Sequence, residues 1–345
     1  MRKTRTMLRA AVAAALALLV AACGDDGPAR TAAEPAASAA PSSAAPAPAA
    51  FPVTVDNCGV TTTYQAAPKR AVAVEQSVVE TMLALGLERS IVGISTRNQT
   101  EVRPDLAAAY KALPVLSARD FSRELLLAAT PDIMVSRQKS SFREDRGLSR
   151  ASLVESGINS HVLGQDCVAG VPTWDALYGE IRTLGRVFGV ADRAERLVGE
   201  MRGAVADVES KVKAATSRPK VFLYDDSGED VPGTRGGNSI DTLLVRTAGA
   251  ENVFADVAGI FGNVSWEELV ARNPDVVVVI EYGAGSGFEA QPRIDRLRNH
   301  PAARNITAVR ENRIVVVNNH QLLLGIRNAE ALRTIAKGIH PGLFG

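Results

Sequence analysis

The chain has few of the side chains from which metal centres, catalytic sets and aromatic cages are built. Its 345 residues include three cysteines, four histidines and 5% aromatic residues. The histidines, at positions 161, 300, 320 and 340, form no ligand-spaced pair, whereas a bare metal ion needs several converging ligands. No Ser-His-Asp or Cys-His set can be assembled with any specificity. We therefore expect no direct metal site, no cofactor, no catalytic residues and no enzyme activity.

A strongly basic segment is also missing beyond the first 22 residues. The whole chain has a net charge of +1, and removal of the four basic residues of that first segment leaves 35 Lys and Arg against 38 Asp and Glu, a net charge of −3. Proteins that bind nucleic acid concentrate positive charge on one face. Nucleic acid is therefore not an expected partner.

The first 22 residues have the composition of an export signal. Four basic residues precede an apolar run of eleven, Ala10–Val20, which is shorter than the roughly 20 residues that span a bilayer. Val20-Ala21-Ala22-Cys23 resembles a bacterial lipobox, which implies that Cys23 is acylated; an ordinary signal with a chance cysteine is the alternative. Residues 23–50 are rich in Ala, Pro and Ser and predict a disordered tether.

Lipidation of Cys23 would leave two cysteines, Cys58 and Cys167. Outside the cytoplasm, such a pair more often forms a disulfide than a metal site. We therefore expect a possible disulfide that ties the segment before the first core strand to the end of the first lobe.

The folded part begins near Phe51 and alternates short strands with helices. The first half predicts strands at 71–75, 91–94, 133–135 and 161–163, and helices at 77–85, 124–129 and 141–156. The second half predicts strands at 220–224, 276–280 and 314–317, and helices at 240–248, 266–271 and 328–339. Such alternation indicates mostly parallel sheets. Residues 173–216 have helical spacing with a break at 189–191. The sequence predicts an α/β protein with two Rossmann-like lobes, 51–172 and 217–345, an interlobe helix within 173–216, and a ligand cleft between the lobes.

One sequence motif occurs twice in the chain. Phe121–Asp132 (FSRELLLAATPD) and Val264–Asp275 (VSWEELVARNPD) share Ser, one free position, Glu, six positions and Pro-Asp before an apolar run. Each Ser is a good helix cap, and a Glu in the first turn suits the positive end of the helix dipole. Helix capping explains why one copy has Ser and Glu at these positions better than it explains why both copies do. Descent of the two lobes from one duplicated lobe is a further explanation for the repeat.

Five blocks resemble, in order, the periplasmic-type substrate-binding proteins of ABC importers for iron–siderophore complexes, haem and cobalamin. They are Pro68–Ser95, Glu124–Val135, Asp241–Asp256, Ser265–Val279 and Ile306–Val317. The resemblance implies two lobes joined by a single long rigid helix. It also implies an exported monomer, anchored to the outer face of the cell membrane by lipidated Cys23, that serves an ABC permease dimer with a cytoplasmic ATPase. The family positions that dock on the two permease subunits match Glu124 and Glu267.

Ligands of doubly wound sheets bind at the carboxyl ends of the strands. The loops there supply a polar set with several arginines, which suit carboxylate, catecholate or hydroxamate oxygens. The candidates for ligand binding are Gln76, Arg97, Arg137, Arg235, Tyr282, His320 and Arg327, of which the first three arginines are preferred. We expect a ferric siderophore or similar metal chelate as the ligand. The same role for cobalamin, haem or another cofactor-like solute is the alternative, and an exported enzyme that uses the cleft is the second.

Overall fold

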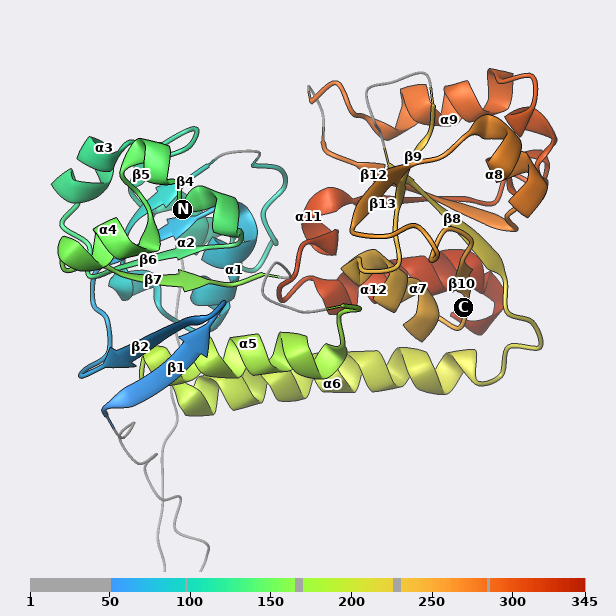
Figure 1. Cartoon of the computed structure of the whole chain (residues 1–345). Coiled ribbons are helices and arrows are strands. Elements are labelled where there is room, and N and C mark those ends of the chain that lie inside the picture. The colour runs from blue at the N-terminus through green and yellow to red at the C-terminus, as the bar shows by residue number, and fades with distance from the viewer. Residues whose placement is uncertain (1–50, 97–98, 165–169, 226–230, 284–285, 345) are drawn as a thin grey trace, which may run out of the picture. The chain divides into compact units, whose positions relative to one another are not determined.

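The computed structural model describes residues 51–96, 99–164, 170–225, 231–283 and 286–344, which form two α/β lobes (Figure 1). Each lobe contains a sheet of largely parallel strands, and the segment between the lobes is helical. The predicted fold class is confirmed. Within the described ranges, no helix is long and apolar enough to cross a bilayer.

The first lobe is built on a five-stranded parallel sheet in the order β5-β4-β3-β6-β7. All residues of the central strands β3 and β6 are buried, as is typical of strands covered on both faces. The strands of this half are β1 (Val53–Asn57), β2 (Val60–Tyr64), β3 (Ala71–Val74), β4 (Ile91–Ser95), β5 (Val115–Ser117), β6 (Ile133–Ser136) and β7 (Asn159–Val162). Its α-helices are α1 (Gln76–Ala84), α2 (Ala107–Lys111), α3 (Arg123–Ala128) and α4 (Arg150–Glu155).

A hairpin of β1 and β2 precedes this sheet and is attached to it by one buried amide. Cys58 and Gly59 both have positive φ, 58° and 76°, as in a two-residue type I′ turn. Asn57 Nδ2 donates to the carbonyl of Val162 at 2.9 Å, and Asn57 Oδ1 accepts from the Val162 N–H at 2.7 Å. Cys58 is disulfide-bonded. Its expected partner, Cys167, lies outside the described residues, so that pairing stays a prediction.

The second lobe has a mixed sheet in the order β11-β9-β8-β12-β13, with β10 also paired to β8. Alternate residues of β12 belong to two apolar clusters, so both faces of this strand are covered, as its continuous apolar run predicts. The strands are β8 (Lys220–Asp225), β9 (Gly233–Arg235), β10 (Glu251–Asn252), β11 (Phe261–Asn263), β12 (Val276–Glu281) and β13 (Ile314–Asn318). The α-helices are α7 (Ile240–Thr247), α8 (Trp266–Arg272), α9 (Ala290–Asn299), α10 (Thr307–Arg310), α11 (Asn319–Leu322) and α12 (Asn328–Ile339).

Two helices follow the first sheet in the sequence and precede the second, α5 (Trp174–Val187) and α6 (Ala191–Val212). In Figure 1 they lie side by side below the lobes, and α6 runs from the first lobe to the second. They are separated at Gly189, which has a φ of 68°, within the predicted break. The 22 residues of α6 span about 33 Å. Its buried side chains from Ala194 to Met201 pack in the core of the first lobe, whereas Val205 and Val208 pack in that of the second. The connecting helix is therefore α6 alone rather than the whole of 173–216.

The helix expected over 141–156 is wrong for most of its length. Two short 3-10 turns, Lys139–Ser141 and Glu144–Arg146, occupy its first part. Gly147 then adopts a left-handed conformation with φ of 62°, which ends the second turn. Ser149 caps α4 by accepting from the Ser152 N–H at 3.2 Å, so the helix begins only at Arg150. As a result, residues 139–148 form a polar loop at the end of β6. The other 3-10 turns of the described residues are Glu88–Ser90, Ala303–Asn305 and Pro341–Leu343.

Candidate functional site

The two copies of the repeated sequence begin equivalent helices, α3 and α8. Ser122 Oγ accepts from the Leu125 N–H at 3.3 Å, and Ser265 Oγ accepts from the Glu268 N–H at 3.0 Å. Both serines are therefore helix caps, as predicted. No reciprocal capping box is formed by Glu268 in the described contacts; its carboxylate instead pairs with Arg272 one turn later.

The Pro-Asp end of each copy attaches the helix to the first strand of its lobe. The backbone N–H groups of Lys69 and Arg70 donate to the Asp132 carboxylate at 2.7 and 3.0 Å. In the second lobe, the Lys220 N–H donates to the Asp275 carboxylate at 2.7 Å. Each aspartate also donates its own N–H to the carbonyl of Arg70 or Lys220, respectively. The repeated aspartates are thus structural residues of each lobe.

The repeated glutamates differ from the serines and aspartates in the contacts that their side chains make. Glu124 and Glu267 are exposed. The backbone N–H of Glu124 and the Ser122 hydroxyl hold the pKa of the Glu124 carboxyl below its usual value, so this group is charged at neutral pH. Within the described part of the chain, no contact joins either carboxylate to a residue beyond its own helix start. A structural role explains Ser and Asp of the repeat but leaves Glu unexplained.

In each sheet, a buried acid lies at the end of the first strand. This is the topological switch point, at which the following strands extend the sheet in opposite directions. In the first lobe this switch lies between β3 and β6, and there Arg137 Nε lies 2.6 Å from Glu75 Oε2. Gln138 Nε2 also donates to Glu75 at 2.5 Å. Glu75 has a φ of 76°, a costly conformation for this residue type that is often found at functional sites.

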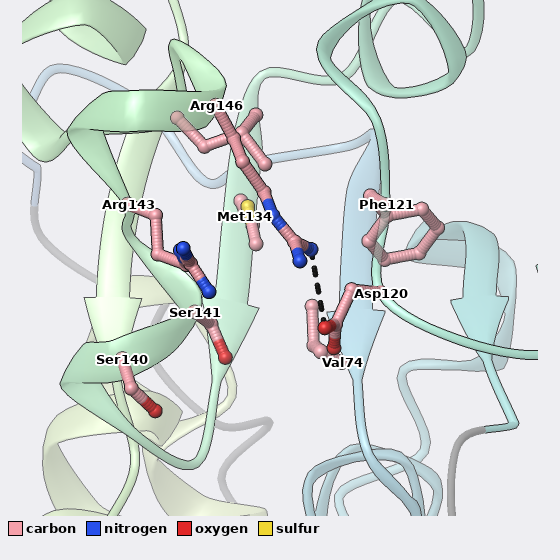
Figure 2. A pocket seen from close by; sticks show the side chains of 9 residues that line it. Val74, Asp120, Phe121, Met134, Ser140, Ser141, Arg143 and Arg146 are labelled. Carbon is pink, nitrogen blue, oxygen red and sulfur yellow. Dashed lines mark hydrogen bonds and ion pairs between the residues drawn. The ribbon is translucent and has the colours of Figure 1, made fainter.

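A small pocket, open to solvent, lies near this pair in the first lobe (Figure 2). Its floor is apolar, and its polar side chains come from the loops after β5 and β6. Arg146 Nη1 lies 3.1 Å from Asp120 Oδ2, and Arg143 Nε lies 2.8 Å from Asp145 Oδ1. The lining residues are Val74, Asp120, Phe121, Met134, Ser140, Ser141, Arg143, Arg146 and Leu148.

The matching switch of the second lobe lies between β8 and β12 and contains two of the predicted residues, Arg235 and Tyr282. Arg235 is 2% exposed, its Nε lies 2.8 Å from Asp225, and its Nη1 lies 3.8 Å from Asp241. Tyr282 accepts from Arg235 at 3.1 Å and donates to Asp225 at 3.1 Å.

Burial shapes the protonation of this cluster. It opposes the charge of Arg235, but Asp241 and Asp225 hold the pKa of the guanidinium above its usual value. Burial raises the pKa of Tyr282 to about 12 and also raises the pKa of Asp241. The cluster therefore contains a fixed cation with at least one anion against it. The Arg235 guanidinium is already hydrogen-bonded or ion-paired within the protein. The sequence had predicted that it would be available to bind ligand oxygens.

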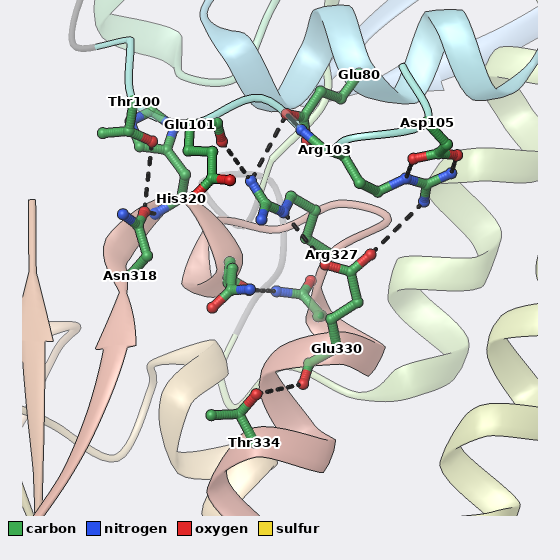
Figure 3. A network of polar contacts seen from close by, with 12 residues as sticks. Glu80, Thr100, Glu101, Arg103, Asp105, Asn318, His320, Arg327, Glu330 and Thr334 are labelled. Carbon is green, nitrogen blue, oxygen red and sulfur yellow. Dashed lines mark hydrogen bonds and ion pairs between the residues drawn. The ribbon is translucent and has the colours of Figure 1, made fainter. Parts of the chain in front are cut away.

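Gln76 and Arg327 both contact Glu80 and Glu101 in a network that joins the two lobes. Figure 3 shows Arg327 beside these two acids. Gln76 is buried; it donates to Glu80 at 2.8 Å and to the Glu101 carbonyl at 3.1 Å. From the second lobe, Arg327 Nη1 donates to the Glu101 carbonyl at 2.9 Å and lies 3.7 Å from Glu80. His320 is buried at the start of α11, where its N–H donates to Asn318 Oδ1 at 2.9 Å.

The predicted site residues thus fall into three places rather than one. Arg235 contacts Tyr282 in the second lobe. Gln76 and Arg327 belong to the network that joins the lobes. Arg137 pairs with Glu75 in the first lobe. Arg97 and Cys23 lie outside the described residues. Sequence reasoning did not predict that acids pair with these arginines, although Glu75 and Asp225 both lie at the end of a predicted strand. It also missed Arg143 and Arg146, which the expected helix had concealed. Among the described residues, no three His, Cys, Asp or Glu side chains are placed to hold a metal ion.

Two α/β lobes joined by one long helix, with polar side chains at the strand ends of each lobe, define a two-lobed solute-binding protein. The model of the periplasmic binding protein family matches residues 72–320, and the chain belongs to this family.

Relatives of known name cover most of the chain. An uncharacterised ABC transporter substrate-binding lipoprotein, YvrC of Bacillus subtilis, is 24% identical over 85% of this chain and 87% of its own. A cobalamin-binding protein of Halobacterium salinarum is 26% identical over 84% of this chain and 74% of its own. The structure of an ABC-type Fe3+-hydroxamate transport system from Saccharomonospora viridis is similar with a TM-score of 0.70 and 29% identity, over 84% of this chain and 99% of that one.

Proposed function

We propose that this protein is an extracytoplasmic, lipid-anchored receptor that captures a metal chelate of the iron–siderophore type and delivers it to an ABC permease. Membership of the periplasmic binding protein family supports the binding role. The relatives named for ABC transport and for an Fe3+-hydroxamate system support the transporter and the ligand class. The cobalamin-binding relative supports the same role for a corrinoid as the alternative. Relatives that bind solutes give the enzyme alternative no support.

The observation that carries the docking part of the proposal is the exposed glutamate of each repeat. The Ser and Asp of the repeat stabilise their own lobe, but Glu124 and Glu267 face solvent at equivalent helix starts. A helix start holds a carboxylate rigidly, and a pair of equivalent acids suits two equivalent basic pockets on a twofold permease. We therefore assign these two side chains to permease docking.

Exchange of both glutamates tests the docking role. The double variant Glu124→Lys, Glu267→Lys should fold and bind its ligand as the wild type does, yet lose uptake of that ligand by cells. Glu155 and Glu311 are also exposed, one in each lobe, so Glu155→Lys, Glu311→Lys is the matched control and should transport normally. Unchanged uptake by the first variant would reject docking through these residues.

Titration of the purified protein with a ligand panel tests the binding role. Ferric siderophores, corrinoids and haem would each be added to the protein, and binding would be measured by calorimetry and by quenching of Trp174 and Trp266 fluorescence. Absence of measurable binding to any member of this panel would overturn the proposed function.

Anchoring is tested separately, because Cys23 lies outside the described residues. Cys23→Ala should abolish acylation and release the exported protein from the membrane. Retention of that variant in the membrane fraction would argue against the lipid anchor.

A further inference from the structure

Three aromatic side chains gather at the strand ends of the second lobe, and we name Phe261, Tyr282 and Phe288 the aromatic platform. Phe261 is 62% exposed and Phe288 40% exposed. Among the well-exposed large apolar side chains in the described ranges, these two are the aromatic ones. An exposed aromatic cluster marks a binding surface more often than an isolated exposed residue does.

Buried contacts hold the aromatic platform in place. The Arg235 guanidinium carbon lies 4.4 Å from the centre of the Phe261 ring, and Arg235 also donates to the Tyr282 hydroxyl at 3.1 Å. The rings of Tyr282 and Phe288 are 5.7 Å apart between centres, and the Tyr282 N–H donates to the Phe288 carbonyl at 3.2 Å. One buried arginine therefore fixes two of the three rings, and the third packs against its neighbour.

Among the described residues, most arginines at the strand ends are paired with carboxylates of the protein itself. Arg235 is paired with Asp225 and Asp241, Arg137 with Glu75, and Arg146 with Asp120. Arg143 is likewise paired with Asp145. Within the described loops, the exposed Arg119 forms no ion pair with a carboxylate. A polyanionic ligand would have to displace these carboxylates or lie against them, and like charges at close range repel.

From this charge balance and from the aromatic platform, we infer that the ligand is an uncharged or zwitterionic metal chelate with an apolar face, and not a polyanionic one. The inference rests on the proposed function and narrows its ligand class. A neutral trihydroxamate chelate and a corrinoid both fit this description, whereas a trianionic tris-catecholate does not. The apolar face of such a chelate would lie on the aromatic platform.

Calorimetry on the mature full-length protein tests the ligand class with a neutral ferric trihydroxamate, cyanocobalamin and a trianionic ferric tris-catecholate. At least one neutral probe should bind about 100-fold more tightly than the tris-catecholate. Its affinity should also change little between about 0.05 and 0.5 M NaCl, because salt screens charge–charge attraction. Tighter binding of the tris-catecholate would overturn the inference and leave the proposed function standing. Failure of all three probes and of haem to bind would overturn both.

The aromatic platform is tested with single substitutions. Phe261→Ala and Phe288→Ala should each weaken binding of the neutral probe about tenfold. Val154, which is 58% exposed on the first lobe, provides the matched control Val154→Ala, and that variant should bind normally. All three variants should keep the wild-type melting temperature. Unchanged affinity in both phenylalanine variants would exclude the platform as the ligand surface.

Discussion

Single residues of the repeated sequence have separable roles in this protein. The serines cap helices, the aspartates receive backbone N–H groups from the first strand of each lobe, and the glutamates contact solvent. A structural role predicts a cost in stability when a side chain is removed, whereas a docking role predicts a cost only in transport. The two kinds of residue can therefore be distinguished by stability measurements on the isolated protein.

Removal of the repeated aspartates should destabilise the fold. Asp132→Ala leaves the N–H groups of Lys69 and Arg70, just before β3, without their carboxylate acceptor, which should lower the free energy of unfolding by about 1–2 kcal/mol. Asp275→Ala should have a similar effect in the second lobe. Glu124→Gln and Glu267→Gln should leave the free energy of unfolding close to the wild-type value. Urea denaturation measures all four, and equal losses in the two groups would contradict this division of roles.

A pH effect is expected from one buried residue near the carboxyl end of the chain. Burial lowers the pKa of His340 below its ordinary value of 6.5, although its Nε2 lies 3.1 Å from the Ala248 carbonyl. The unfolded chain then binds a proton that the folded chain resists, so stability is retained above pH 6.5 and declines as pH falls below it. Urea midpoints between pH 7.5 and 5.5 should fall less in His340→Gln than in the wild type. The same decline in both proteins would exclude this histidine as the cause.

At the scale of secondary-structure elements, α5 and α6 pack closely because of a small residue. A Cβ atom on Gly185 would lie 2.4 Å from the Ala194 Cβ, whereas a Cβ on Gly179 of the same helix would meet nothing within 4 Å. Neither glycine has a positive φ, so backbone strain does not distinguish them. The two positions therefore separate helix propensity from helix packing.

Alanine at these two glycines should change stability in opposite directions. Gly179→Ala should raise the free energy of unfolding by about 0.5–1 kcal/mol, because alanine favours the helix. Gly185→Ala should lower it by about 1–3 kcal/mol, because the added methyl group forces α5 away from α6. Thermal or urea unfolding of the two variants provides the measurement. Stabilisation by both would show that the helices separate without cost.

Local sequence pattern predicted helices well where their apolar periodicity was uninterrupted. The α12 helix begins and ends at the predicted residues, 328 and 339, and the predicted break before α6 is present. The helix expected at 141–156 was wrong because Gly147 and Ser149 outweigh the apolar spacing around them. Ion pairs such as Arg137–Glu75 join residues 62 positions apart, and no local pattern records which strands become neighbours. The loops of the site could thus be predicted, but not which of their arginines are already paired.

At the scale of the whole molecule, the two lobes are joined by contacts besides α6. Arg327 of the second lobe reaches the Glu101 carbonyl and Glu80 of the first, and Thr100 Oγ1 lies 3.5 Å from Asn318 Oδ1 (Figure 3). Glu80 is fully buried, and removal of the partner of a buried charge is costly. This network should therefore restrict movement of one lobe relative to the other.

Loss of Arg327 should loosen that restriction without unfolding either lobe. In Arg327→Ala, the amides of residues 99–103 should exchange hydrogen faster. The Glu101 carbonyl loses its donor, and Glu80, which accepts from the Arg103 N–H, loses its ion-pair partner. The bound ligand should also dissociate faster, because a more mobile pair of lobes holds it less firmly. Arg333 is exposed on the same helix, so Arg333→Ala is the control and should behave as the wild type. Identical exchange at residues 99–103 in the two variants would show that α6 alone fixes the lobes, and that Arg327 is free to serve the ligand.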